Sequence, residues 1–269
     1  MTYSIVARDK TTGEFGVAVQ SHYFQVGPVV PWALGGVGAV ATQSRVNVSF
    51  GPLGLDYMRA GYSAEQALRA LLAGDSQPDV RQVALVDGTG NVAAHTGAKC
   101  IPAAGHRMLA ALDAAEGQGG DIRGKQSAAM LIVSGTPTGR SWEDRIVDLR
   151  VEDASDPLVE LRRLLHIKRA YEADSAADRL EEGGDKDAAL HKRREAMVLA
   201  PEMVELRFWS GLSMAEAGRL DEGCRLIAEA AAKNQRWIET IRRLVAVERI
   251  TAELADAIEA RLSPASSRL

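Results

Sequence analysis

The sequence that decides the fold stands at the N-terminus and reads Thr2-Tyr3-Ser4-Ile5-Val6-Ala7-Arg8-Asp9. Polar and apolar residues alternate behind Thr2, and the run leads through a glycine-containing turn at residues 10–14 into a second apolar run at residues 15–21. Two such runs joined by a short turn predict a β-hairpin. Because this hairpin begins at residue 2, we expect no leader peptide before it.

Thr2 is the first candidate for a catalytic residue. It follows Met1 and is small enough for Met1 to be trimmed, which would leave a free N-terminal threonine. Such a residue carries nucleophile and base together, because its neutral α-amine can take the proton of its own hydroxyl. The α-amine has an ordinary pKa of about 8, so a useful fraction is neutral at neutral pH. The alternative interpretation is that Thr2 is an ordinary β-former at the start of a strand.

Composition limits the class of protein. The 269 residues are 46% hydrophobic and 25% charged, as in a soluble globular protein. A net charge of −4 gives no basic face for nucleic acid, and no apolar run reaches the 18 residues of a membrane span. We therefore expect neither nucleic acid nor membrane as a partner. The two cysteines, Cys100 and Cys224, predict no disulfide framework, and we expect the protein to be cytoplasmic.

Strands and helices come in groups along the first part of the chain. Strands are predicted at residues 35–43, 80–87, 92–96, 127–134 and 145–151, and helices at residues 52–60, 63–74 and 107–116. The second helix opens with a capping box, in which Gln66 can reach back to Ser63. Runs of strands with helices grouped between them predict an α+β fold with mainly antiparallel sheets.

Several separated motifs follow one another in the same order as in a known family. They are Thr2-x-Ser4-Ile5-Val6-Ala7-Arg8-Asp9, Thr12-Gly13-Glu14-x-Gly16-Val17-Ala18-Val19, Val29-Val30-Pro31-Trp32-Ala33, Gly36-Val37-Gly38-Ala39-Val40-Ala41-Thr42-Gln43, Gly51-Pro52-x-Gly54-Leu55, Ala94-His95-Thr96-Gly97, Gly119-Gly120-Asp121-x-Arg123-Gly124-Lys125-Gln126-Ser127-Ala128 and Asp148-Leu149-Arg150-Val151. In these motifs, roughly residues 2–165 resemble the DUF1028 family.

The resemblance implies both a fold and an activity. The DUF1028 family is similar to the Ntn-hydrolase superfamily, whose members use an N-terminal Thr, Ser or Cys in a four-layer αββα sandwich. The resemblance implies that fold here, with Thr2 as the nucleophile. One departure stands out: His106 runs straight into Arg107, where relatives carry a further strand and most of a helix. Any site residues on that stretch are absent from this chain, and a sheet edge is expected to be exposed.

From Asp156-Pro157 onward the sequence predicts helices almost throughout. A repeat with a 34-residue offset, marked by Gly184 and Gly218, resembles the tetratricopeptide repeat of two antiparallel helices. We therefore predict an Ntn-hydrolase-like domain at residues 1–155, a helical domain at residues 156–262 and a flexible tail at residues 263–269. About two repeats are fewer than a solenoid needs to stand alone, so we expect them to pack on the N-terminal domain or on a second subunit. For the whole protein we expect a homo-oligomer, a dimer.

Four further residues are predicted to lie near Thr2 if the hairpin and its neighbours fold as expected. Ser21 and His22 end the second strand, which returns beside the start of the first. Gln43 and Asn47, like Ser21, are candidates for the hydrogen-bond donors that an oxyanion requires. Gln43 joins them only if its strand pairs in the matching direction.

The sequence leaves two possible roles open for each of Lys125 and His95. Lys125 could lower the pKa of the Thr2 amine by like-charge repulsion, or it could cap its loop or reach to solvent. His95 ends an apolar strand and could carry protons or bind substrate, or it could be a structural histidine with a satisfied hydrogen bond.

The sequence supports two hypotheses of different classes. No HExxH or CxxC motif occurs, so neither a metal nor a cofactor is expected. The first hypothesis is an amidohydrolase in which Thr2 attacks a small amide, lactam or short peptide. The second is a non-catalytic binding or scaffolding protein whose helical domain docks protein partners.

Overall fold

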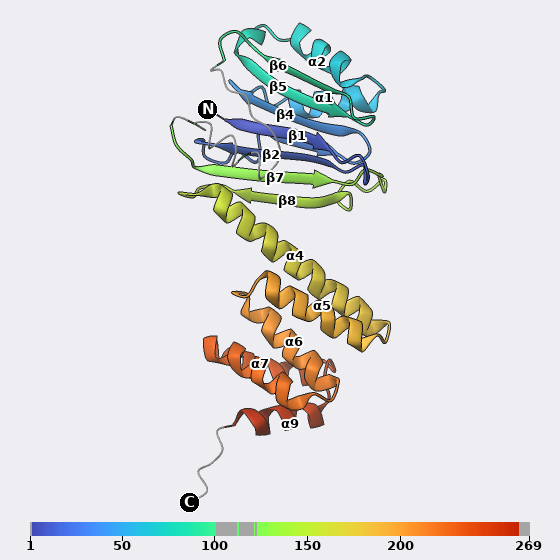
Figure 1. Cartoon of the computed structure of the whole chain (residues 1–269), viewed down its shortest axis with the longest axis vertical. Helices are drawn as coiled ribbons and strands as arrows, with labels where there is room; N and C mark the ends of the chain where they lie inside the picture. Colours follow the sequence, from blue (N-terminus) through green and yellow to red (C-terminus); the bar gives the residue numbers. More distant parts are fainter. Residues whose placement is uncertain (1, 101–111, 113–120, 122, 264–269) are drawn as a thin grey trace, which may run out of the picture. The chain divides into compact units, whose positions relative to one another are not determined.

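The computed structural model describes residues 2–100, 112, 121 and 123–263, and the chain divides into two compact units, residues 1–164 and 165–269. The first unit contains the strands and the first helices (Figure 1). These are β1 (Tyr3–Arg8), β2 (Phe15–Ser21), β3 (Pro31–Leu34), β4 (Gly38–Ser44), α1 (Phe50–Arg59), α2 (Ala64–Ala73), the 3-10 turn η1 (Pro78–Val80), β5 (Arg81–Asp87), β6 (Val92–Thr96), β7 (Ser127–Val133) and β8 (Arg145–Val151).

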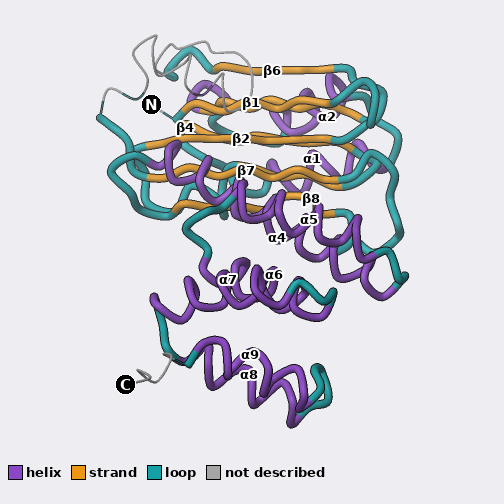
Figure 2. Tube along the Cα trace, turned by 60° about the horizontal axis from the view of Figure 1, so that its bottom comes forward, coloured by secondary structure: helices purple, strands orange, loops and turns teal. Residues whose placement is uncertain are grey.

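The strands form two four-stranded sheets, ordered β1-β2-β7-β8 and β3-β4-β5-β6. Every pair of neighbours is antiparallel, and the first pair is the predicted hairpin, with Tyr3 opposite Gln20 and Arg8 opposite Phe15. Figure 2 shows the strands of both sheets running side by side. The α+β class with antiparallel sheets is therefore confirmed.

The two sheets pack face to face through the alternate residues of their inner strands. Val17 and Val19 of β2 meet Ala39 and Ala41 of β4 in one buried cluster, which Leu131 of β7 extends. Small residues on β4 suit this contact because they allow the two sheets to approach closely. The predicted glycine-rich strand at residues 35–43 is thus the centre of the sandwich, and the observed strand begins at Gly38.

A helical layer covers the outer face of the second sheet. Leu55 and Met58 of α1 and Leu71 of α2 pack against Val40 and Leu85 of the sheet. The predicted capping box starts α2: the Ser63 hydroxyl accepts from the Gln66 N–H, and the Gln66 side chain accepts from the Ser63 N–H. The helix predicted at residues 107–116 falls outside the described residues apart from Leu112, which is buried.

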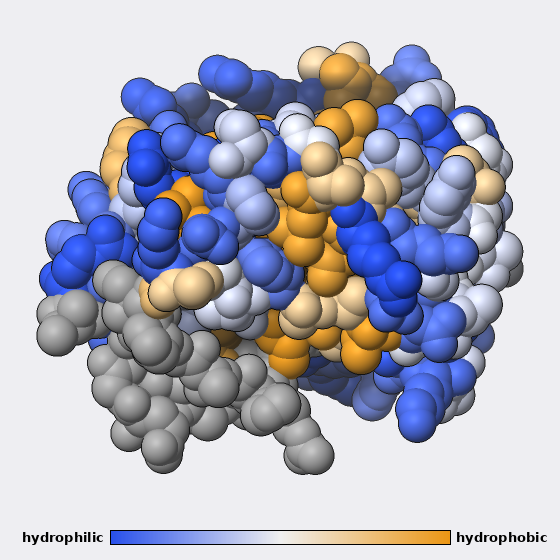
Figure 3. All heavy atoms as spheres, turned by 90° about the horizontal axis from the view of Figure 1, so that it is seen from above, coloured by the Kyte–Doolittle hydropathy of each residue, from blue (hydrophilic) through white to orange (hydrophobic). Residues whose placement is uncertain are grey.

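The upper face of the first unit, which carries α2 and β6, shows a band of apolar residues between hydrophilic ones (Figure 3). Val92 of β6 is 70% exposed, whereas the side chains of Ala93 and His95 on the same strand are half-buried. The strand therefore buries only one of its faces among the described residues.

The second unit is helical. Its helices are α4 (Pro157–Glu182, which begins in the first unit), α5 (Lys186–Leu199), α6 (Val204–Glu216), α7 (Leu220–Lys233), α8 (Arg236–Ala246) and α9 (Ala252–Leu262). The helices α5 and α7 each span 14 residues, and each follows a glycine with positive φ, Gly184 or Gly218. The sequence repeat thus corresponds to a repeated turn and helix. No helix of the described chain is long and apolar enough to cross a membrane.

The helices α6 and α7 approach each other through two glycines. A Cβ atom added to Gly223 would lie 2.3 Å from the carbonyl oxygen of Gly211, and one added to Gly211 would lie 2.7 Å from the carbonyl oxygen of Gly223. No side chain fits between the two backbones at this point. Phe208, Ile227 and Ile241 belong to a buried apolar cluster of the unit to which both helices contribute.

Candidate active site

The hairpin brings the hydroxyl groups of Thr2 and Ser21 together. Because Tyr3 pairs with Gln20, the next residues outward face each other, and the Thr2 Oγ1 atom lies 2.8 Å from the Ser21 Oγ atom. Ser21 is fully buried, while Thr2 is only partly buried. Either hydroxyl can donate this hydrogen bond. The structure thus places a candidate nucleophile beside a buried partner hydroxyl.

Gln43 ties Thr2 to the second sheet. Its Nε2 group donates to the carbonyl oxygen of Thr2 at 3.0 Å and to Gln82 Oε1 at 2.9 Å. The Gln82 amide in turn donates to Thr96 Oγ1 at 3.3 Å. An amide has only two N–H donors. Since both donors of Gln43 are engaged, Gln43 holds the backbone of Thr2 and has no N–H left for an oxyanion.

Asp121 belongs to the same end of the sheet and is not among the residues that the sequence singles out. Its Oδ2 atom accepts from the backbone N–H of His22 at 3.1 Å and from the Arg123 Nη2 atom at 2.7 Å, and its Oδ1 atom accepts from the Arg123 Nε atom at 3.0 Å. Burial alone would raise the pKa of Asp121, but the Arg123 and His22 hydrogen bonds hold it below its ordinary value. Asp121 thus fixes the chain where it leaves β2.

His22 and Lys125 lie on the loops at this end. The exposed imidazole of His22 lies next to Gly124, where an added Cβ atom would be 3.9 Å from the His22 Nδ1 atom. The Lys125 ammonium forms an ion pair with Asp156 at 3.1 Å. This ion pair joins the loop before β7 to the residue that precedes α4.

His95 and Asn47 have local structural partners. The His95 Nε2 atom lies 3.0 Å from the carbonyl oxygen of Pro78. Strand alternation turns His95 toward the helical layer, whereas Gln82 on β5 faces the other sheet. The Asn47 side chain accepts from the Ser49 hydroxyl at 2.7 Å just before α1. Neither residue is joined to Thr2 by a hydrogen bond of the described chain.

The assembled group is suited to proton and acyl transfer more than to metal chemistry. Thr2, Ser21 and Gln43 offer neutral hydroxyl and amide groups. No set of three or more His, Cys, Asp or Glu side chains in the described parts of the chain could hold a metal ion. Hydroxyl nucleophiles need a base, and the base that Thr2 could supply itself is its α-amine.

The family model of DUF1028, a family of unknown function, matches residues 2–109 and 104–161, which is more than half of the chain. The chain belongs to the DUF1028 family. The match comes in two parts, which overlap at residues 104–109. The crystal structure of the DUF1028 protein SPO2555 from Silicibacter pomeroyi is similar, with a TM-score of 0.51 and 29% identity; the match covers 61% of this chain and 87% of that one. No curated protein matches the chain.

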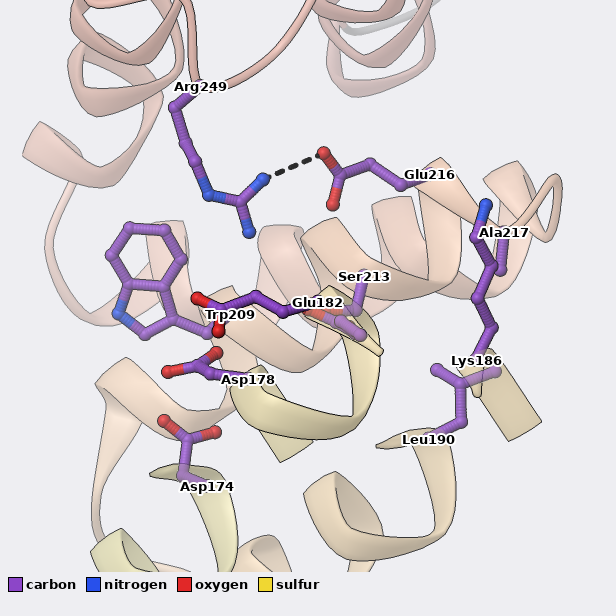
Figure 4. Close-up of a pocket in the computed structure, with 11 residues that line it drawn as sticks. Asp174, Asp178, Glu182, Lys186, Leu190, Trp209, Ser213, Glu216, Ala217 and Arg249 are labelled. Atoms are coloured by element: carbon purple, nitrogen blue, oxygen red, sulfur yellow. Dashed lines mark hydrogen bonds and ion pairs between the residues drawn. The ribbon is translucent and has the colours of Figure 1, made fainter. Parts of the chain in front are cut away.

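Beyond the residues matched to DUF1028, the second unit holds a pocket of about 620 Å³. Figure 4 shows carboxylate groups of α4 pointing into the same space as the indole ring of Trp209. The pocket is lined by five carboxylates, from Asp174, Asp178, Glu181, Glu182 and Glu216, but by only two cationic side chains, Lys186 and Arg249. Its lining is therefore acidic.

A buried arginine compensates part of this charge. Arg193 of α5 is 2% exposed and forms ion pairs with Asp174 at 2.6 Å, Asp178 at 2.7 Å and Glu181 at 2.9 Å. Arg249 pairs with Glu216 at 3.0 Å. Glu182 has no ion-pair partner among the described residues. Of the carboxylates that line the pocket, the network thus leaves that of Glu182 available to a ligand.

Proposed function

We propose that this DUF1028 protein is an amidohydrolase that uses Thr2, freed by removal of Met1, as its nucleophile. The observation that carries the proposal is the 2.8 Å contact between the Thr2 and Ser21 hydroxyls, together with the Gln43 hydrogen bond to the Thr2 carbonyl. These contacts hold the threonine by its backbone and its side chain. The resemblance to Ntn hydrolases supports the same assignment, and the substrate class is a small amide, lactam or short peptide.

The proposed reaction proceeds by acyl transfer. The Thr2 hydroxyl oxygen attacks the amide carbonyl carbon while the α-amine of Thr2 takes the hydroxyl proton. The C–N bond then breaks, the proton passes to the leaving amine, and the acyl group remains as an ester on Thr2. Water hydrolyses this ester and restores the hydroxyl. Ser21 is the donor nearest to Thr2 that could stabilise the developing oxyanion.

Intact mass and turnover test this proposal together. The mature protein is expected to lack Met1, and a screen of small amides is expected to find turnover that Thr2→Ala abolishes and Thr2→Ser partly keeps. Thr12→Ala, in the hairpin turn at the other end of β1, serves as the control and is expected to keep full activity. Retention of Met1 in an active protein would refute the mechanism, because the α-amine would then be part of a peptide bond.

A second candidate function rests on the acidic pocket of the helical unit. We propose that this pocket docks a lysine- or arginine-containing segment of a partner protein. Carboxylates and an indole ring together suit an alkylammonium or guanidinium group, because the ring attracts cations over its face. Burial raises the pKa of Glu216, and the neighbouring Glu181 charge raises it further. A cationic partner would offset the repulsion between these two carboxylates.

A charge reversal tests the docking proposal. A lysine-rich peptide is expected to bind the protein and to change the fluorescence of Trp209, with an affinity that falls as salt increases. Glu182→Lys, at the pocket, is expected to weaken binding by at least about tenfold, whereas Glu253→Lys, exposed on α9, is expected to have little effect. Equal loss in both variants would indicate nonspecific attraction to an acidic protein.

A further inference from the structure

The edge strands β1 and β6 lie on the same side of the sandwich. β1 ends the first sheet and β6 ends the second. Across the sandwich, β7 lies against β3, β2 lies against β3 and β4, and β1 lies against β4 and β5. No strand of the described chain pairs with the outer edge of β1, in the place that would come next above β5 and β6. The second sheet therefore extends past the first by about one strand.

The part of the second sheet that extends past β1 is open and mostly apolar. Ala93 packs with the helical layer, so strand alternation turns Val92, Ala94 and Thr96 toward the first sheet. All three are exposed, and Val92 is 70% exposed. We call these three residues the open face of β6. Between Ser4 of β1 and this face the structure leaves a cavity of about 90 Å³.

The outer edge of β1 carries main-chain groups without a partner strand. The Asp9 N–H donates to the Glu14 carbonyl oxygen at 2.8 Å, in the register of the hairpin. Because an antiparallel ladder is hydrogen-bonded at every second position, Ser4, Val6 and Arg8 direct their N–H and C=O groups to the outer edge. The seven residues of β2 are all buried, whereas the six of β1 are only half-buried.

This edge is suited to an extended main chain more than to a single amide. Outward groups recur at every second residue, which is about 6.8 Å along a strand, and such a row is a template for one further strand. A lactam or a small amide can engage only one of these positions, whereas an extended peptide can engage several. Thr2 precedes the first residue of β1, so the candidate nucleophile stands at one end of the row.

We propose that the substrate is an extended peptide that adds to the outer edge of β1 as a further antiparallel strand and presents the amide at its C-terminal end to Thr2. Counted back from the cleaved bond, its first, third and fifth residues stand opposite Thr2, Ser4 and Val6. Paired residues have their side chains on the same face, so these three side chains meet the open face of β6. Cleavage at Thr2 rests on the proposed hydrolase function, but the pairing of peptides with β1 does not.

Binding is measured by amide hydrogen exchange and NMR on the full-length Thr2→Ala protein, which lacks the nucleophile. The probe is a five-residue peptide that alternates valine and serine, begins and ends with valine, and is blocked at both ends. It is uncharged, so the acidic pocket of the second unit does not attract it. The peptide is expected to slow exchange of the Ser4 and Val6 amides at least about tenfold. The amides of the open face of β6, which point to the other free edge, are expected to stay unchanged.

N-methylated peptides identify the amides that pair with β1. A methyl group on the central valine removes the N–H that donates to the Ser4 carbonyl oxygen, and it is expected to weaken binding at least about tenfold. A methyl group on either serine, whose N–H points away from β1, is the matched control and is expected to have little effect.

A proline on β1 tests the same contact from the side of the protein. Val6→Pro removes an outward N–H and no hydrogen bond to β2, and it is expected to weaken binding at least about tenfold. Val6→Ala loses the valine side chain but keeps the N–H, so it is expected to bind like the parent protein. If Val6→Pro fails to fold, the methylated peptides still decide.

The outcomes separate this inference from the proposed function. Peptide pairing with β1 without any amide turnover by the wild type would refute the hydrolase and leave the peptide site standing. Turnover of a lactam or small amide without protection of Ser4 and Val6 would overturn the peptide site and leave the hydrolase standing. Protection of the β6 amides instead, or equal weakening by both kinds of methylated peptide, would overturn the inference. Protection without peptide that grows with protein concentration would assign the edge to a second copy of the chain and would overturn it too.

Discussion

The Thr2 Oγ1 atom lies 2.8 Å from the Ser21 Oγ atom, although 19 positions separate the two residues in the chain. The hairpin turn at residues 9–14 and the unbroken pairing from Tyr3–Gln20 to Arg8–Phe15 produce this contact. An insertion of one residue in the turn would shift the pairing and turn Thr2 away from Ser21. The contact therefore depends on the register of the whole hairpin.

Replacing Ser21 should affect activity more than stability. Ser21→Ala removes one hydrogen bond to Thr2, and we expect a loss of about 1 kcal/mol in the free energy of unfolding. If Ser21 also serves the oxyanion, amide turnover should fall about 100-fold. Ser21→Thr, which keeps the hydroxyl, is the matched variant for the rate measurement. An unchanged rate in Ser21→Ala would exclude Ser21 from the reaction.

The ion pairs of Arg193 should matter greatly for stability. Arg193→Met leaves three carboxylates near one another without their buried cation, and we expect a loss of about 3–5 kcal/mol in the free energy of unfolding. Arg243→Met, whose 81% exposed side chain pairs with Glu239 at 3.8 Å, should change it by less than about 0.5 kcal/mol. Urea unfolding followed by circular dichroism compares the two variants.

Asp87 should give the first unit a characteristic acid sensitivity. The Asp87 side chain accepts from the Ala64 N–H at 3.0 Å, the first residue of α2, and from Thr89 and Asn91 in the turn after β5. Burial alone would raise the pKa of Asp87, but these hydrogen bonds lower it to about 2. Since the folded pKa is lower than the unfolded one, the stabilisation is complete above about pH 4 and is lost as pH falls toward 2.

The measurement for Asp87 is a comparison across pH. The stability difference between wild type and Asp87→Asn should be about 2 kcal/mol at pH 6, and it should shrink steadily between pH 4 and pH 2. Asp56→Asn on α1, where the wild-type carboxylate is more than half exposed, is the control. Its stability should differ little from that of the wild type at pH 6 and at pH 2. A difference that stays constant with pH would contradict the assignment.

The close approach of α6 and α7 predicts a sharp response to a single methyl group. In Gly223→Ala the new Cβ atom would lie 2.3 Å from one backbone oxygen and 2.9 Å from the Ala215 nitrogen, so the helices must move apart. We expect a loss of about 1–3 kcal/mol in the free energy of unfolding. Gly183→Ala, whose added Cβ atom meets nothing closer than 3.4 Å, should change it by less than about 0.5 kcal/mol.

Much of the first unit could be predicted because its signals are local. Alternation and turn residues located β6 at residues 92–96, and the Ser63 capping box located the start of α2. The contact of Thr2 with Ser21 followed from hairpin geometry alone. The helical repeat was also visible in the sequence, because a glycine is favoured where the turn needs positive φ, as at Gly184 and Gly218.

The rest of the candidate site depends on contacts between distant segments. Gln82 reaches Gln43 only because β5 pairs with β4 in one particular register, and no local pattern specifies that register. Asp121 lies in a glycine-rich motif that resembles one of the DUF1028 family. Its hydrogen bond to the His22 N–H joins residues 99 positions apart, so no local pattern predicts it. Lys125 could have faced Thr2 or solvent, and the partner that it meets, Asp156, stands 31 positions away.

The glycine pair at the crossing of α6 and α7 also constrains how this protein can evolve. Side chains elsewhere in a helical core can exchange volume with their neighbours, so that a loss at one position is offset by a gain at another. Gly211 and Gly223 have no such freedom, because each lies against the backbone of the other helix and no residue is smaller than glycine. We therefore expect descendants that keep these two helices to keep both glycines, even where the surrounding helices have diverged beyond recognition.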